Sequence, residues 1–198
     1  MTAYVCSMKR TRISDIRNQE FITAALKATH DHGFHAVTMT EIANQIGATA
    51  ASINYYFGSK DRLMHETMRH LLDLLRQEHI AALSRAEGAK ARLRAIIDAN
   101  FSDTFFTPEH CRFWVQFWSV APYSETLARL QNINRARVRS HFRHELRHLT
   151  PPHTRETIRR LIQSYMDGVW VAVAQGERTL NPAHARQEAY ALIDLVLR

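Results

Sequence analysis

The apolar residues of this chain recur at helical spacing along almost its whole length, and this periodicity constrains the fold more than any other feature. The six glycines and five prolines fall between the periodic segments, where they mark turns and helix ends. Several segments open with a capping signal, such as Thr38 followed by Glu41, or Asn181 followed by Pro182. The pattern predicts an all-α protein of nine helices with no strand. The expected helices cover residues 14–33, 38–47, 49–56, 60–85, 89–105, 107–122, 124–149, 154–174 and 181–196.

Composition narrows the class of partner. The chain has 198 residues and an excess of lysine and arginine over aspartate and glutamate, 26 against 19, which favours an anionic partner such as nucleic acid or an anionic membrane surface.

Its two cysteines, Cys6 and Cys111, exclude a disulfide framework and a four-cysteine zinc site, so we expect a reducing cytoplasm. No apolar run approaches the roughly 20 residues that span a bilayer, and the first twelve residues lack the apolar stretch of a secretory signal. Nothing in the sequence calls for a cofactor.

Two short helices joined at Gly47 form a candidate DNA reader, because a helix-turn-helix needs a tight turn at that point. Ile53 and Phe57 are one helical turn apart and are expected to face inward. The Asn54 amide suits an adenine edge, and Lys60 suits a phosphate near a helix N-terminus. A tight helical corner without a role in DNA binding is the alternative. The residues expected to contact DNA are Thr38, Thr40, Thr49, Ala50, Ala51, Ser52, Asn54, Tyr55, Tyr56 and Lys60.

Residues 38–64, TMTEIANQIGATAASINYYFGSKDRLM, resemble the DNA-binding signature of the TetR family of transcriptional repressors. The matching features are the capped helix, the glycine turn, the aromatic run that ends at Phe57, then Lys60 and Leu63. Two positions depart from the family pattern: Ala51 stands where glycine is usual and Asn54 where an aromatic is common. These departures leave the operator sequence open.

The resemblance implies a homodimer that binds a palindromic, double-stranded operator. It implies a three-helix DNA-binding domain over residues 13–60 and a ligand-binding and dimerisation domain over residues 61–198, whose last two helices form a four-helix interface. From the apolar periodicity of these helices we expect an interface built by Tyr165, Val169, Val173, Leu192, Ile193 and Val196.

Three tryptophans are the informative feature of the second half. Trp114 and Trp118 are four residues apart on one predicted helix, and Trp170 follows Asp167 by three residues on another. Several indole faces and a carboxylate are what a quaternary ammonium ion requires, since it cannot donate a hydrogen bond. Aromatic residues at this spacing can equally fill a core. The candidate ligand-binding residues are Trp114, Trp118, Trp170, Asp103, Asp167, Phe117 and Asn100.

Four segments of this half resemble the choline-sensing members of the same family, which control glycine betaine synthesis from choline. This likeness implies a repressor that answers choline and governs genes for choline uptake and glycine betaine synthesis. A family member that senses another hydrophobic cation or a drug is the alternative. The segments are residues 93–103, 113–118, 127–137 and 166–170.

Residues 144–148 read His-Glu-Leu-Arg-His, the HExxH pattern of zinc peptidases, in which two histidines bind zinc and the glutamate is the general base. Arg143 and Arg147 make this helix cationic, and no further ligand motif follows, so we expect neither a zinc-dependent hydrolase nor another enzyme. An adventitious surface metal site is the other alternative. The arginines at positions 135, 137, 139, 143 and 147 predict a solvated helix face.

Overall fold

The structure, a computed structural model, describes residues 13–197. Cys6 and the rest of segment 1–12 lie outside the described residues. Within residues 13–197 the chain forms nine α-helices, one short 3₁₀ helix and no strand, which confirms the all-α prediction. The elements are α1 (Ile13–His32), α2 (Met39–Asn44), α3 (Ala50–Phe57), α4 (Lys60–Leu83), α5 (Ala89–Asn100), α6 (Pro108–Val120), η1 (Ala121–Tyr123), α7 (Glu125–Leu146), α8 (Pro152–Ala174) and α9 (Pro182–Val196).

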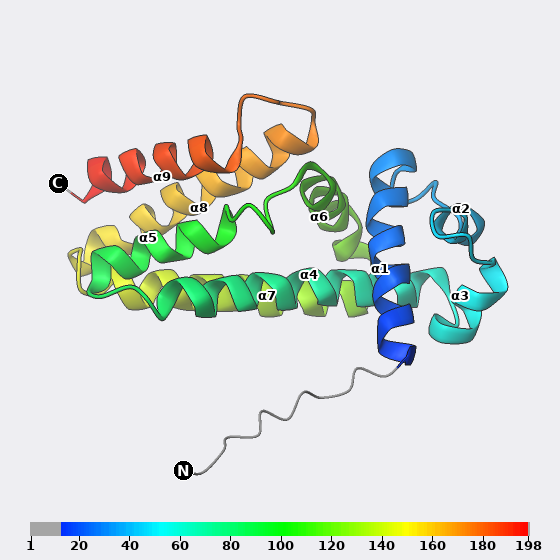
Figure 1. Cartoon of the computed structure of the whole chain (residues 1–198). Coiled ribbons are helices and arrows are strands. Elements are labelled where there is room, and N and C mark those ends of the chain that lie inside the picture. Colours follow the sequence, from blue (N-terminus) through cyan, green and yellow to red (C-terminus); the bar gives the residue numbers. More distant parts are fainter. Residues whose placement is uncertain (1–12, 198) are drawn as a thin grey trace, which may run out of the picture.

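Helices α1 to α3 stand at one end of an elongated bundle made by α4 to α9 (Figure 1). The long helix α4 begins beside α3 and runs along the bundle, so the expected division after residue 60 falls in its first turn. Among the helices in residues 13–197, none is long and apolar enough to cross a bilayer.

The capping box of α2 and the turn between α2 and α3 form as the sequence predicts. The Thr38 hydroxyl accepts a hydrogen bond from the Glu41 amide at 3.2 Å, and the Glu41 carboxylate accepts one from the Thr38 amide at 2.7 Å, which completes the capping box. Gly47 adopts a φ of 62°, a left-handed conformation that glycine tolerates best. Phe57 is buried, and its ring centroid lies 6.1 Å from that of Phe21 on α1.

Helix α5 ends at Asn100, five residues before the predicted end. The backbone leaves the helical conformation at Phe101, and the Ser102 hydroxyl accepts a hydrogen bond from the Phe105 amide at 3.2 Å. This turn sends the rings of Phe101, Phe105 and Phe106 into the core. The free energy gained by burying three aromatic rings thus exceeds what further helical turns would gain here, although the apolar periodicity of the sequence continues.

Helix α6 fastens the N-terminal helices to the bundle. The Arg112 guanidinium donates hydrogen bonds to the His30 carbonyl near the end of α1 at 3.1 Å and to the Ala174 carbonyl at the end of α8 at 3.2 Å. One turn further on, the Gln116 side chain accepts a hydrogen bond from the Phe34 amide. The last carbonyls of a helix have no intrahelical partner, so a cationic side chain stabilises them. Helix α6 therefore joins the N-terminal unit directly to the rest of the protein.

The apolar stripes of α8 and α9 face the protomer's own core. Val169 and Val173 are 5% and 7% exposed, and Ile193 is fully buried. Our expectation that these three residues meet a partner protomer is therefore wrong. The outer faces of the two helices carry Leu161 and Leu195 instead, which are 48% and 63% exposed.

Candidate functional site

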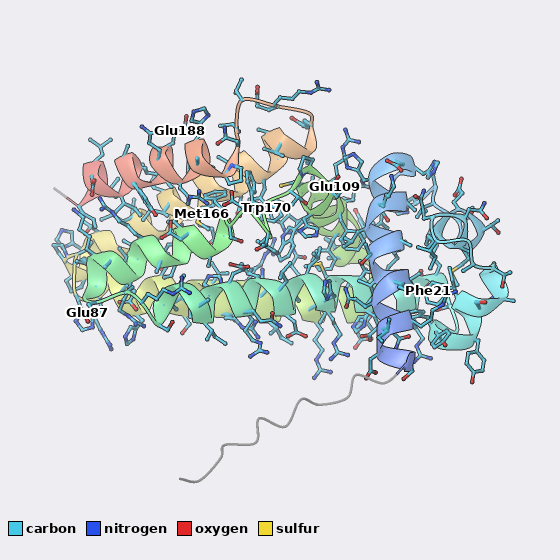
Figure 2. The ribbon with its side chains drawn as sticks, in the orientation of Figure 1. Phe21, Glu87, Glu109, Met166, Trp170 and Glu188 are labelled. Atoms are coloured by element: carbon cyan, nitrogen blue, oxygen red, sulfur yellow. The ribbon has the colours of Figure 1, made fainter. Side chains whose placement is uncertain are left out.

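A cavity of about 190 Å³ lies inside the helical bundle. Figure 2 shows Met166 and Trp170, two of its lining residues, in the interior of the bundle. Helices α4 to α8 all contribute to its walls, which mix aromatic, amide and charged side chains. The lining residues are Leu75, Asn100, Trp114, Phe117, Trp118, Gln131, Asn134, Arg135, Val138, Gln163, Met166, Asp167 and Trp170.

The aromatic wall of the cavity is held in place by its neighbours. Trp114 and Trp170 are nearly fully buried, and their ring centroids are 5.3 Å apart. The Trp170 Nε1–H group donates a hydrogen bond to the Asn100 side-chain oxygen at 2.8 Å, which satisfies the one polar group of this indole. Phe105 packs against both indoles, with centroid distances of 5.6 and 5.0 Å. Trp118 is only half-buried, so it is the indole most open to an incoming ligand.

Asp167 supplies the only carboxylate among the lining residues. The protein packed around it raises the pKa of Asp167 to about 6, although the positive charges of Arg135 and Arg159 act in the opposite direction. Solvent still reaches this residue, which lies at the wall of the cavity. A carboxylate that is poorly solvated when charged gains from a cation that binds beside it.

Six of the seven residues predicted to bind ligand line this cavity, but Asp103 does not. Asp103 is exposed in the loop between α5 and α6, because α5 ends at Asn100 and the following turn directs the phenylalanines inward. The structure therefore leaves Asp167 as the one predicted counter-charge at the cavity.

The sequence argument missed four polar lining residues, Gln131, Asn134, Arg135 and Gln163. Arg135 is exposed, as its place in the arginine run predicts, and it also lines the cavity. Its position gives a signal that could have found it, since it continues at four-residue spacing the stripe of Leu127 and Gln131, both buried on α7. A charged residue in register with a buried stripe points toward the interior or toward a cavity.

Some of the residues predicted to contact DNA are exposed, and others are partly buried. Thr49 caps α3 by accepting a hydrogen bond from the Ser52 amide at 3.1 Å, and Asn54 and Tyr55 are exposed. Tyr56 is half-buried because its ring packs against Phe21, with centroids 5.6 Å apart. Of the other candidates, the exposed ones are Thr38, Thr40, Thr49 and Ala51, whereas Ala50, Ser52 and Lys60 are partly buried.

Lys60 has a partner in its own chain. Its Nζ donates a hydrogen bond to the His35 carbonyl at 2.9 Å, and burial lowers the pKa of Lys60 although Asp61 and Glu41 oppose this effect. The bond ties the first turn of α4 to the loop between α1 and α2. Lys60 therefore lies where α3 meets the long helix of the bundle.

The HExxH segment is divided between the core and the surface. Glu145 is buried and accepts a hydrogen bond from the Arg92 Nε at 2.9 Å, whereas His144 and His148 are exposed. In the described part of the chain, no group of three histidine, cysteine, aspartate or glutamate residues is placed to hold a metal ion. A glutamate engaged in this way cannot act as the general base beside a zinc ion on the two histidines.

Two family models match the chain. Residues 21–67 match the model described as bacterial regulatory proteins, tetR family, and residues 89–198 match the model described as BetI-type transcriptional repressor, C-terminal. The HTH-type transcriptional regulator BetI of Agrobacterium fabrum is 37% identical over 96% of this chain and 93% of its own length. The BetI regulator of Vibrio parahaemolyticus is 34% identical over 88% of this chain and 86% of its own length.

Solved structures share the fold. A putative transcriptional regulator from Saccharomonospora viridis, determined in complex with choline, superposes with a TM-score of 0.79 at 20% identity and covers 90% of this chain and 96% of its own. A putative transcriptional regulator from Pseudomonas aeruginosa PAO1 gives a TM-score of 0.76 at 24% identity over 92% of this chain and 91% of its own.

The raised pKa of Asp167 predicts how stability varies with pH. Between about pH 4, its ordinary pKa, and pH 6, the folded state binds a proton that the unfolded state has released, so this residue lowers stability as pH rises. We expect Asp167→Asn to raise the free energy of unfolding at pH 7 by on the order of 1 kcal/mol, a value reduced because solvent reaches the side chain, and to have no such effect at pH 4. Urea unfolding at both pH values measures this difference. The control is Asp103→Asn in the exposed loop, and an equal pH-dependent gain in that variant would contradict the assignment.

Proposed function

This chain belongs to the BetI-type transcriptional repressors of the TetR family, and on that basis we propose that it is a choline-responsive repressor of genes for choline uptake and glycine betaine synthesis. Members of this family are transcriptional regulators, so the chain is not an enzyme. We place its action in the cytoplasm, where it binds a palindromic operator as a homodimer. The observation that carries the choline assignment is the cavity that combines an aromatic wall with one carboxylate.

The chemistry of choline fits this cavity. Its trimethylammonium group cannot donate a hydrogen bond, so a site must hold it through aromatic faces and a counter-charge. Trp114, Trp118 and Trp170 offer the faces, and Asp167 offers the charge. Gln131 and the other lining amides can bond to the hydroxyl group at the opposite end of choline. The relative from Saccharomonospora viridis, which was determined with choline, supports the same assignment.

Two helices connect this cavity with the DNA reader. Helix α6 carries Trp114 and Trp118 on the cavity side, and its Arg112 and Gln116 bond to the end of α1 and the residues that follow it. Helix α4 lines the cavity at Leu75 and begins next to α3. A ligand that favours one position of α6 and α4 therefore biases the position of the reading head, provided that it binds the two states with different affinity.

We assign the dimer interface to the outer faces of α8 and α9. Leu161 and Leu195 are exposed large apolar residues on these faces. Gly168 is exposed in the middle of α8, and a Cβ added there would meet no atom within 4 Å outside the backbone of its own helix. A glycine inside a helix costs about 1 kcal/mol relative to alanine, and close approach of a partner helix would offset this cost.

Charged substitutions on the outer face should separate the protomers. We expect the double variant Leu161→Asp, Leu195→Asp to sediment as a folded monomer. It should bind the operator far more weakly, because each protomer then binds a single half-site without its partner. In contrast, Val169→Asp should unfold the protomer, since that residue is buried in its own core. Sedimentation and circular dichroism distinguish the two results, and a dimeric double variant would locate the interface elsewhere.

Loss of one indole should weaken choline binding while leaving the repressor folded. Trp118→Leu removes the half-buried indole of the cavity. We expect choline binding to become weaker by on the order of 1–2 kcal/mol, about a tenfold loss of affinity or more. The matched control is Tyr123→Leu, which removes an aromatic ring that is 92% exposed and does not line the cavity. Isothermal titration calorimetry measures both, and operator binding without choline should stay unchanged in each.

The neutral isostere of choline provides the second arm of this test. 3,3-Dimethylbutanol has the shape of choline without its charge, so a site that recognises the cation should bind it much more weakly. Equal affinity for the two compounds would mean that the cavity binds apolar molecules in general and that choline is not the effector. Tighter binding of another hydrophobic cation in the same titration would favour the alternative of a different sensor ligand.

The DNA reader can be tested by replacing one side chain at a time. We expect Lys60→Ala to weaken binding to all DNA sequences alike, because one phosphate contact is lost. The slope of log affinity against log salt concentration should fall in magnitude by about one unit. Lys27→Ala is the control, since Lys27 is an exposed lysine of α1 that pairs with Asp31. Asn54→Ala should instead relax selectivity at one operator position. An unchanged salt dependence in Lys60→Ala would show that this lysine only holds the His35 carbonyl.

A further inference from the structure

The cavity holds a positive charge that the binding of choline alone does not explain. Arg135 of α7 lines the same cavity as Asp167 of α8, and the two charges influence each other. A guanidinium group at this position repels a simple cation, so it lowers the affinity for choline. A site built only for a cation would gain from a neutral residue here.

The guanidinium of Arg135 is available to a ligand. Within residues 13–197 this group takes part in no hydrogen bond, and no carboxylate oxygen lies within 4 Å of it. Arg159, the other arginine near Asp167, differs because it bonds to Glu156 at 2.8 Å and to Gln163. The cavity lining contains one basic residue, Arg135, and one acidic residue, Asp167, so their charges balance.

One ligand class satisfies both charges at once. A molecule that joins a quaternary ammonium group to a carboxylate can place its cationic end against the indoles and Asp167 and its anionic end against Arg135. The planar guanidinium matches a carboxylate with two parallel hydrogen bonds, which gives direction as well as affinity. The hydroxyl group of choline makes no comparable contact with this side chain.

We infer that the cavity also binds a zwitterion made of a quaternary ammonium and a carboxylate, with Arg135 as the residue that selects the carboxylate end. This inference rests on the proposed choline site, because both ligands use the same aromatic wall. Glycine betaine, which carries a trimethylammonium group one carbon from its carboxylate, is the probe of this class. The two compounds therefore compete for the cavity.

The test compares two ligands on two arginine variants of the full-length dimer. Arg135→Gln should reduce the affinity for glycine betaine by about tenfold to a hundredfold, the effect of one charge-assisted contact, and should leave the affinity for choline equal or higher. Arg139→Gln is the matched control, since Arg139, like Arg135, is an exposed arginine of α7 but does not line this cavity. It should change neither affinity. Isothermal titration calorimetry measures both ligands, and choline binding by Arg135→Gln shows that this variant is folded.

The outcomes separate this inference from the proposed function. Choline binding without glycine betaine binding up to its solubility limit would overturn the inference alone, and so would glycine betaine binding that is equal in Arg135→Gln and the unchanged protein. Failure of both ligands to bind the unchanged protein would overturn the proposed function as well. If Arg135→Gln does not fold, Arg135→Lys takes its place. We expect that variant to weaken glycine betaine binding, because lysine keeps the charge but lacks the planar fork, and an undiminished affinity would overturn the inference.

Discussion

The contact that the rest of this structure depends on is the docking of α6 against the ends of two other helices. Arg112 bonds to one terminal carbonyl of α1 and one of α8, and thereby satisfies backbone acceptors that their own helices leave unpaired. Because these carbonyls also carry the negative end of each helix dipole, one guanidinium stabilises both. Without this contact, the three N-terminal helices would meet the bundle mainly through α4, and the reading head would be poorly oriented relative to the sensor half.

The same helix builds the aromatic wall of the cavity. Trp114 and Trp118 line the cavity from the same turns of α6 that carry Arg112 and Gln116. Any shift of α6 caused by a ligand therefore also changes the contacts of this helix with the end of α1 and the residues after it. The short loop after α5 completes this wall, since Phe105 packs against both buried indoles and leaves Trp118 as the more open one. A stiff wall with one accessible indole suits recognition of a small cation, because little ordering remains to be done on binding.

The electrostatics of the cavity determine which small molecules suit it. The surrounding protein raises the pKa of Asp167 although solvent reaches it, so a cation beside it favours the charged carboxylate. Arg135 adds a second, opposite charge on the facing helix, and the pair distinguishes this cavity from a merely apolar one. On the proposed assignment of this cavity, ligand selectivity depends on which ends of a molecule carry charge and how far apart they are, in addition to shape.

The sequence by itself determined where the helices begin, the capping box of α2 and the reader turn, because these depend on neighbouring residues such as Thr38 and Glu41. It also identified the indoles of the cavity by their helical spacing. Only the tertiary structure decided what covers each apolar face. Val169 of α8 and Ile193 of α9 lie on apolar stripes that sequence alone could assign to a partner, yet the protomer buries them itself. The positions of Asp103 away from the cavity and of Arg135 at its wall were likewise decided by long-range packing. Periodicity reports which side of a helix is apolar, but the identity of the surface opposite it depends on contacts between residues far apart in the chain.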